Sequence, residues 1–329
     1  MQDRPTHKNM LLTILSFIGA LAIILFGANM LTDGASALAR KFNISELVIG
    51  LTIVALGTSL PEFVISLGSA LKGSSGISLG NIIGSNIFNS LLILGVAALI
   101  YPIKFSAKML LREIPFNLLS AVALTLVSGS MIYGATCEGE YITRTGGMLL
   151  LCFLAIFIRY TFSIAKDDSA TDKETGATMS SWKITLYIVG GLACLILGGN
   201  IFVDAATNIA IAVGLSEAVI GITIVSAGSS LPELAVSVNA ARKKNAGIAL
   251  GNVLGSNIMN IFLILGSTAT ICPIELTEFR FIDYYVLIAS SLLIYIVGKF
   301  GGKAIITRLE GALLICCYVA YTVFLILNN

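Results

Sequence analysis

The chain has 329 residues, of which 57% are hydrophobic and 12% are charged, and its formal net charge is +2. Soluble domains carry about 25% charged residues, so this composition excludes an ordinary soluble protein, and we expect no nucleic-acid partner. Apolar runs of about 20 residues, enough to cross a bilayer, recur along the chain. The alternating strands of about ten residues that are typical of a membrane β-barrel do not occur. We therefore expect an all-α polytopic membrane protein.

Ten hydrophobic segments follow one another along the chain. They lie at about residues 10–31, 46–71, 77–101, 110–133, 145–165, 183–205, 217–241, 248–271, 281–299 and 304–327. No small-residue cleavage site follows the first segment, so it is expected to be a retained helix and not a signal peptide. The polar, Ser/Thr-rich stretch Ala165–Ser181 separates two groups of five helices and is typical of a linker. The expected organisation is a first five-helix repeat at 1–164, a linker at 165–182 and a second five-helix repeat at 183–329.

The two halves share sequence at a constant offset of 171 residues. Leu47–Ser66 and Ala218–Ser237 agree at 12 of 20 positions, and Gly76–Asn89 and Gly247–Asn260 agree at 10 of 14. The duplicated cores, which we call the α-repeats, lie at about 46–101 and 217–271. The duplication covers the first three helices of each half without a gap.

The distribution of Lys and Arg predicts the orientation of the helices in the membrane. With the loops numbered by the ten segments, 15 of these residues collect on one side and 5 on the other. Because cytoplasmic loops carry the excess of positive charge, we expect a plasma-membrane protein with both termini outside and the central linker in the cytoplasm. Five helices per half is an odd number, so the repeats should run in opposite directions. Inverted repeats are typical of transporters that alternate access to a midplane site.

A polar motif occurs once in each repeat, as GTSLPE at Gly57–Glu62 and as GSSLPE at Gly228–Glu233. Each copy places a carboxylate beside a proline near the middle of an apolar segment. A single proline there is often a packing kink, and a single Glu can serve an interhelical hydrogen bond. Two Glu at equivalent positions of a repeat favour a functional site, because a carboxylate at membrane depth is costly.

The proline also predicts how backbone atoms could join the site. It removes a helical hydrogen bond, which should free carbonyl groups around Ala55–Thr58 to face a cation. Thr58 and Glu62 are four residues apart and therefore share a helix face. The second copy offers the Ser226 carbonyl, the Ser229 hydroxyl and the Glu233 carboxylate.

A second motif, GNxxGSNIxN, follows in each repeat. Its glycines recur every four residues, at 76, 80 and 84 and at 247, 251 and 255, which predicts close helix packing. Its polar positions are Asn81, Ser85, Asn86 and Asn89 in the first copy and Asn252, Ser256, Asn257 and Asn260 in the second. Asn81, Asn86, Asn252 and Asn257 are equally compatible with interhelical hydrogen bonds and with a site, whereas Asn89 and Asn260 are expected in the site.

These residues form an all-oxygen ligand set without imidazole or thiolate. Such a set suits Ca²⁺, which takes about 6–8 oxygen ligands, and Na⁺, and it suits Mg²⁺ less well. Two Glu neutralise one Ca²⁺, so another cation must replace its charge after release. This requirement favours an exchanger over a channel.

The paired motifs resemble those of the cation/Ca²⁺ exchanger superfamily, and within it the prokaryotic Na⁺/Ca²⁺ exchangers, over nearly the whole chain. The resemblance implies ten transmembrane helices as two inverted five-helix repeats, transport without a cofactor, and a two-helix gating bundle made by the first helix of each half. It implies a central diamond of Glu62, Asn89, Glu233 and Asn260. It further implies hydroxyl ligands from Thr58, Ser85, Ser229 and Ser256, and carbonyl ligands from Ala55 and Ser226.

The chain departs from the family pattern at two of these positions. Many Na⁺/Ca²⁺ exchangers have Asp where Asn260 stands, which makes Na⁺ stoichiometry and K⁺ dependence open questions. Ser229 replaces a common Thr but keeps the hydroxyl. The GNxxE pattern of the Ca²⁺/H⁺ branch is absent, because Gly84 and Gly255 occupy the matching positions.

The leading interpretation is therefore Na⁺-driven Ca²⁺ antiport in the lipid bilayer, by a chain expected to be a monomer. Exchange of Ca²⁺ for H⁺ is the alternative. A cation channel would need no counter-ion. An intramembrane hydrolase would need paired aspartates or a Ser/His dyad at membrane depth, but Asp33 and Asp204 lie near helix ends and His7 lies in the terminal tail.

Overall fold

The structure is a computed structural model that describes residues 7–129, 141–167, 179–212, 226–276, 281–300 and 304–328. Within these ranges eight helices are long and apolar enough to cross a membrane. The bent pair Glu46–Thr58 and Leu60–Leu71 brings the number to nine when its two parts are counted as one span. The prediction of an all-α polytopic membrane protein is confirmed. The count of ten is not reached, because the expected segment 217–241 lies partly outside the described residues.

Where both halves of the chain are described, they fold into similar series of elements. The first half contains α1 (His7–Phe42), α2 (Glu46–Ile49), η1 (Gly50–Val54), α3 (Ala55–Thr58), α4 (Leu60–Leu71), α5 (Ser75–Ile87), η2 (Phe88–Ile93), α6 (Leu94–Ile100), β1 (Ile103–Lys104), α7 (Ala107–Leu111), α8 (Glu113–Val127), β2 (Tyr141–Ile142) and α10 (Arg144–Asp167). The second contains α11 (Ser181–Ala212), α13 (Ser226–Ser229), α14 (Leu231–Arg242), α15 (Ala246–Met259), η5 (Asn260–Leu265), α16 (Gly266–Ile271), β3 (Ile274–Glu275), α17 (Phe281–Phe300), β4 (Ile305–Ile306) and α18 (Arg308–Asn328).

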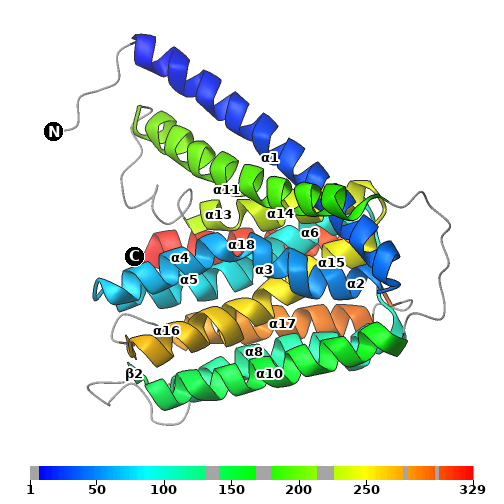
Figure 1. Cartoon of the computed structure of the whole chain (residues 1–329). Coiled ribbons are helices and arrows are strands. Elements are labelled where there is room, and N and C mark those ends of the chain that lie inside the picture. Colours follow the sequence, from blue (N-terminus) through cyan, green and yellow to red (C-terminus); the bar gives the residue numbers. More distant parts are fainter. Residues whose placement is uncertain are drawn as a thin grey trace.

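Equivalent elements of the two halves run in opposite directions. In Figure 1, α5 and α6 pass from left to right across the molecule, whereas α15 and α16 pass from right to left. Two short antiparallel strand pairs join the halves: β1 pairs with β4, and β2 pairs with β3. Each pair takes one strand from each half, so the halves interlock as inverted repeats.

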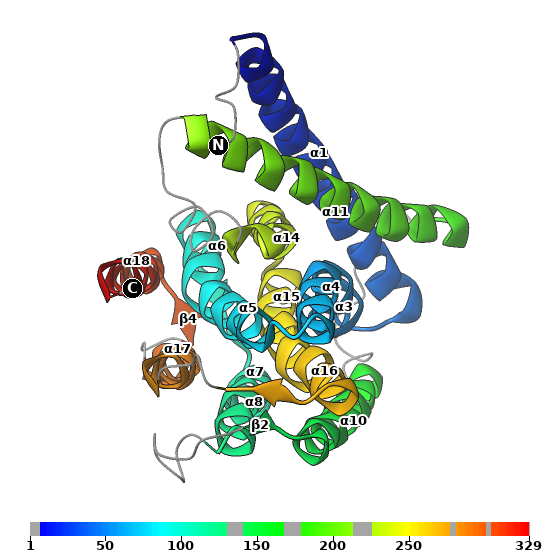
Figure 2. The same cartoon turned by 90° about the vertical axis from the view of Figure 1, so that its left-hand side faces the viewer.

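The first helices of the two halves, α1 and α11, form a pair that lies across the other helices (Figures 1 and 2). Glycines let the two backbones approach closely. A Cβ at Gly27 would lie 2.8 Å from the carbonyl oxygen of Gly191. Lys41 near the end of α1 donates a hydrogen bond to Ser181 at the start of α11. We call α1 and α11 the helix pair below.

The two α-repeats meet at the centre of the molecule, where α3, α4, α5 and α15 lie together in Figure 2. A Cβ at Gly251 would lie 2.6 Å from the carbonyl oxygen of Leu47, and one at Gly255 would lie 2.7 Å from that of Leu51. The packing predicted for these glycines is therefore confirmed. At Gly84 a Cβ would meet no neighbour within 4 Å among the described residues, but the residues equivalent to those that pack on Gly255 lie outside the described part of the chain or have side chains that do.

Candidate ion-binding site

Both copies of the proline motif break a helix. In the first, α3 ends at Thr58, Ser59 adopts φ −82° and ψ 8°, and α4 begins at Leu60. The axis bends by 46° at this break. In the second copy Ser230 adopts nearly the same angles, φ −91° and ψ 9°, before α14 begins at Leu231. Each proline then lies in the first turn of the new helix, where its missing N–H costs no hydrogen bond.

The break places each carboxylate at the start of a helix in the protein interior. Glu62 lies in the first turn of α4 and Glu233 in the first turn of α14, and both side chains are 0% exposed. The positive end of a helix dipole stabilises negative charge there. This favourable field offsets only part of the cost of burying a carboxylate, so each group requires donors or a cation.

Hydrogen bonds to the carboxylates cross between the repeats. Ser230 donates to Oε1 of Glu62 over 2.9 Å, and Ser59 donates to Oε1 of Glu233 over 3.0 Å. Each carboxylate thus depends on the serine that precedes the other proline. The two helix breaks are therefore held side by side as one structural unit.

Weaker contacts come from within each repeat. Ser85 lies 3.5 Å from Oε1 of Glu62, and Ser256 lies 3.4 Å from Oε1 of Glu233. Both serines were expected to contribute hydroxyl groups to the site. The structure places each of them beside the carboxylate of its own repeat.

Asn252 connects the breaks through its side-chain amide. Its Nδ2 donates to the carbonyl oxygen of Glu233 over 3.1 Å and to the Ser237 hydroxyl over 2.9 Å, and its Oδ1 accepts from Thr58 over 3.1 Å. Asn252 therefore holds the backbone of Glu233 in its own repeat and the hydroxyl of Thr58 in the opposite repeat.

Asn81 repeats this arrangement in the other direction. Its Nδ2 donates to the carbonyl oxygen of Glu62 over 3.3 Å and to Ser66 over 3.0 Å, and its Oδ1 accepts from Ser229 over 3.2 Å. Of the two interpretations left open for Asn81 and Asn252, the observed contacts are interhelical hydrogen bonds.

The other amides lie where α5 and α15 approach η2 and η5. Asn86 Nδ2 donates to the Asn257 carbonyl over 3.3 Å, and Asn257 Nδ2 donates to Ser90 over 2.8 Å. Asn260 Nδ2 donates to Asn86 Oδ1 over 3.1 Å. The Oδ1 atom of Asn260 accepts no hydrogen bond from the described residues.

Several buried oxygens of this region have no hydrogen-bonding partner in the described part of the chain. They are Glu62 Oε2, Glu233 Oε2, Asn89 Oδ1, Asn257 Oδ1 and Asn260 Oδ1. Buried polar atoms are nearly always paired, so a group of unpaired oxygens that includes two carboxylates fits a cation. No group of three or more His, Cys, Asp and Glu occurs among the described residues, so this oxygen set differs from a thiolate or imidazole metal site.

The two asparagines of the expected diamond lie in π-helical turns. Asn89 is the second residue of η2, and Asn260 is the first residue of η5. Such turns are rare and are frequently found at functional sites. Both Asn89 and Asn260 are 0% exposed.

The two expected carbonyl ligands differ in how much the structure describes. The Ala55 carbonyl accepts the Ser59 N–H over 3.0 Å, and it also lies 3.3 Å from Thr58 Oγ1. Thr58 has one hydroxyl hydrogen, so when it donates to Asn252 the Ala55 oxygen keeps a lone pair for a cation. Ser226 is the first residue of α13, and its side chain lies outside the described part.

Sequence reasoning missed four serines that contact the site. Ser59 and Ser230 bond to the carboxylates, and Ser66 and Ser237 hold the amides of Asn81 and Asn252. All four recur at the offset of 171 residues inside the duplicated motif, which is the signal that could have identified them. Their common position was visible in the sequence, whereas the direction of their side chains was not.

Comparisons with known proteins place this site in a family. The model of the sodium/calcium exchanger protein family matches residues 12–163 and 183–327. The chain belongs to the sodium/calcium exchanger protein family. It is 35% identical to the sodium/calcium exchanger MaX1 of Methanosarcina acetivorans, over 93% of this chain and 96% of that protein. It is also 35% identical to the inner membrane protein YrbG of Escherichia coli, over 86% of this chain and 88% of that one.

A solved exchanger structure has the same architecture. The sodium-calcium exchanger NCX_Mj, soaked with zero Na⁺ and Ca²⁺, aligns with a TM-score of 0.81 at 33% identity. The alignment covers 96% of this chain and 99% of that one. This exchanger is therefore an integral membrane protein. Its family consists of transporters and not of enzymes.

Proposed function

We propose that this exchanger moves Ca²⁺ against Na⁺ by alternating access to one site between the broken helices. The ligands are Glu62, Glu233, Asn89 and Asn260, supported by the hydroxyls and carbonyls named above. The observation that carries this proposal is the pair of buried carboxylates whose Oε2 atoms have no partner among the described residues. Ca²⁺ and Na⁺ both favour such an oxygen set.

Charge balance explains why the site should exchange ions and not merely release them. Two ionised carboxylates compensate one Ca²⁺, and its departure would leave two uncompensated charges in a medium of low dielectric constant. That state costs several kcal/mol, which disfavours movement of the empty site across the membrane. Na⁺ ions that enter from the opposite side restore the balance and permit the return step.

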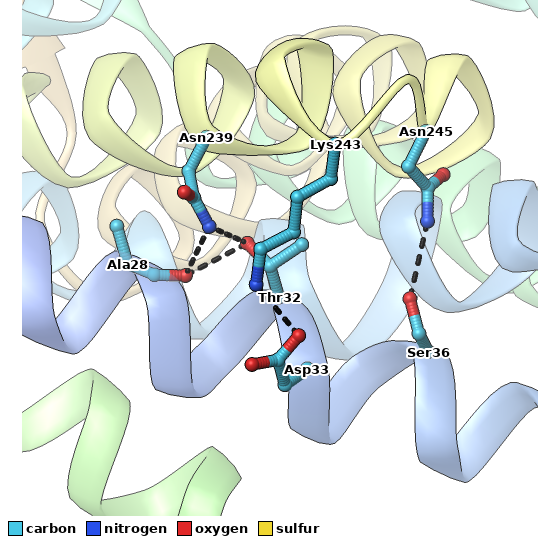
Figure 3. A network of polar contacts seen from close by, with 7 residues as sticks. All are labelled: Ala28, Thr32, Asp33, Ser36, Asn239, Lys243 and Asn245. Carbon is cyan, nitrogen blue, oxygen red and sulfur yellow. Dashed lines mark hydrogen bonds and ion pairs between the residues drawn. The ribbon is translucent and has the colours of Figure 1, made fainter.

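We further propose that the helix pair provides the alternation. It lies across the site-bearing helices, and α1 contacts α14 directly through side chains (Figure 3). With both termini outside, the ends of α1 and α14 that meet there face the cytoplasm. Sliding of the helix pair would expose the site first to one side and then to the other.

Exchange of Ca²⁺ for H⁺ is the second candidate. Asn260 leaves the site with two carboxylates, and two protons would neutralise them as well as two Na⁺ ions would. Gly84 and Gly255 weigh against this candidate, because the pattern of the proton-coupled branch, GNxxE, has Glu at the matching positions.

The test is uptake of radiolabelled Ca²⁺ into proteoliposomes loaded with Na⁺. Choline-loaded vesicles and vesicles subjected to a pH jump are the controls. Uptake that requires an outward Na⁺ gradient supports Na⁺/Ca²⁺ exchange. Uptake driven by the pH jump alone, and insensitive to Na⁺, would replace the proposal with Ca²⁺/H⁺ exchange.

A further inference from the structure

A polar network fastens α1 of the first repeat to α14 of the second (Figure 3). Asn239 donates to the Ala28 carbonyl over 3.2 Å and to the Thr32 hydroxyl over 3.0 Å. Lys243 forms an ion pair with Asp33 over 2.6 Å. One turn further, Asn245 donates to Ser36 over 3.1 Å. No described hydrogen bond or ion pair of these side chains reaches the ion-binding site.

The inverted repeat places a second acid and a second lysine at the equivalent positions. At the offset of 171 residues, Asp33 is equivalent to Asp204 on α11, and Lys243 is equivalent to Lys72 at the end of α4. Lys72 has φ −88° and ψ 2°, and Lys243 has φ −81° and ψ 6°, so both lysines leave their helices in the same way. The chain therefore carries the parts of the same ion pair twice.

Only one of the two pairs is formed. The side chains of Asp204 and Lys72 are exposed, and the described residues provide neither with an ion-pair or hydrogen-bond partner. Gly68 and Gly199 are the equivalents of Asn239 and Ala28. A Cβ built on either glycine would meet no neighbour within 4 Å in the described ranges. Among the described residues, the helix pair thus contacts α14 closely and makes no such contact at the equivalent positions of α4.

We propose that Asp33–Lys243 and Asp204–Lys72 are alternating latches, and that each forms when the other breaks. In the conformation described here the first latch holds α1 on α14. When the helix pair slides, α11 approaches the end of α4, Asp204 meets Lys72, and the first latch opens. This inference rests on the alternating access proposed above, because it assigns two residue pairs to its two end states.

The two latches differ in strength. Beside the closed latch, Asn239 donates a hydrogen bond to Thr32. Beside the other latch, the equivalent residues are Gly68 and Val203, which cannot form that bond. Ser74 and Thr207 retain the polar character of Asn245 and Ser36. The side with more hydrogen bonds should be favoured, so the ion-free protein should rest in the conformation with Lys243 on Asp33.

Cysteine cross-linking tests the proposal with a first readout, disulfide formation, that is separate from transport. In a cysteine-free background, Asp204→Cys is combined with Lys72→Cys, and Asp33→Cys with Lys243→Cys. A disulfide requires Cα atoms about 4.4–6.8 Å apart, so cross-linking reports the approach of the two positions. We expect both pairs to form disulfides under oxidation, detected by mass spectrometry. Each disulfide should arrest exchange until a reductant restores it.

A matched control combines Ala206→Cys with Lys72→Cys. Position 206 is two residues from Asp204 and therefore faces away from it on α11, so no cross-link is expected. Absence of the 204–72 disulfide, under conditions in which the 33–243 disulfide forms, would overturn the alternating latches. If exchange continues in the uncross-linked background, Na⁺/Ca²⁺ antiport would stand while this inference fails.

If a cysteine variant does not fold, charge reversal provides an independent test of the Asp204–Lys72 pair. Asp204→Lys and Lys72→Asp should each slow exchange by about two- to fivefold, as expected for an exposed ion pair. The double variant should recover most of the rate, because the pair is restored with its charges exchanged. The proposal would be contradicted if the exchange rate of the double variant were reduced by both single effects combined.

Discussion

Ser59 of the first repeat donates a hydrogen bond to the Glu233 carboxylate of the second over 3.0 Å, and its repeat equivalent Ser230 donates to Glu62 over 2.9 Å. This exchange of partners makes the site a property of both repeats together. A substitution at one helix break should therefore alter the position of the carboxylate at the other break.

Replacement of Ser59 by Ala should weaken Ca²⁺ binding through Glu233. The bond holds the Glu233 carboxylate in place, and without it the ion itself must order that group, so we expect the apparent Ca²⁺ affinity to fall. A hydrogen bond to a charged group contributes about 1.5–3 kcal/mol, which sets the upper limit of the loss at about tenfold to a hundredfold. Ser230→Ala should give a loss of similar size, and Ser59→Thr should retain most of the affinity. The measurement is the Ca²⁺ concentration that gives half-maximal uptake.

The matched control for these serines is Ser267→Ala. Among the described residues, Ser267 donates only to carbonyls of its own helix, at Leu263 and Ile264. An equal loss in Ser267→Ala and Ser59→Ala would show that the effect is general and not a result of the bond to Glu233.

Glu62→Gln should abolish Ca²⁺ transport while the protein remains folded, because the change removes charge and nearly preserves shape. Glu233→Gln should do the same from the other repeat. Uptake is compared at equal protein content, with elution as a single peak in size-exclusion chromatography as the check of folding. Normal transport by either variant would refute its assignment as a ligand.

Asn260→Asp should keep Ca²⁺ transport and change its dependence on Na⁺ or pH. Asn260 donates to Asn86 Oδ1 over 3.1 Å, and a carboxylate there would place two acceptors together. The new acid must then hold a proton or the Asn86 amide must turn, which ties the site to a further positive charge. Uptake measured across a Na⁺ series at several pH values tests this. Unchanged profiles would indicate that Asn260 is not a ligand.

Gly251→Ala should destabilise the contact between the repeats. Its Cβ would lie 2.6 Å from the Leu47 carbonyl oxygen and 3.0 Å from Gly50 Cα, and backbone atoms there cannot move aside cheaply. A loss of about 1–3 kcal/mol is typical of such overpacking, and it should lower the midpoint of thermal unfolding in detergent. Gly19→Ala is the control, because Gly19 is exposed on α1 and no described neighbour lies within 4 Å of its Cβ position. Equal midpoints for the two variants would contradict the packing account.

The duplicated motifs predicted much of the fold and part of the site. Glu62 and Glu233 were expected at helix breaks, and the structure places them in the first turns of α4 and α14. Burial of a carboxylate in an apolar segment is unusual enough to be recognised from composition alone.

The crossing of hydrogen bonds between the repeats could not be predicted. Ser59 follows the end of one helix and precedes another, so its side chain could have met either repeat. Tertiary packing decides that choice, through close approaches such as the one between Gly251 and Leu47. The same holds for the contact of Asn239 with Ala28, because residues 211 positions apart share no local sequence pattern.

The central claim is that one Ca²⁺ binds between Glu62 and Glu233 at a site that Na⁺ can also occupy. Equilibrium binding of radiolabelled Ca²⁺ to the purified protein tests it directly, with increasing Na⁺ as competitor and Glu62→Gln as the paired variant. The account predicts saturable binding that Na⁺ displaces and that the variant lacks. Binding that is equal in the variant, or that Na⁺ does not reduce, would contradict it.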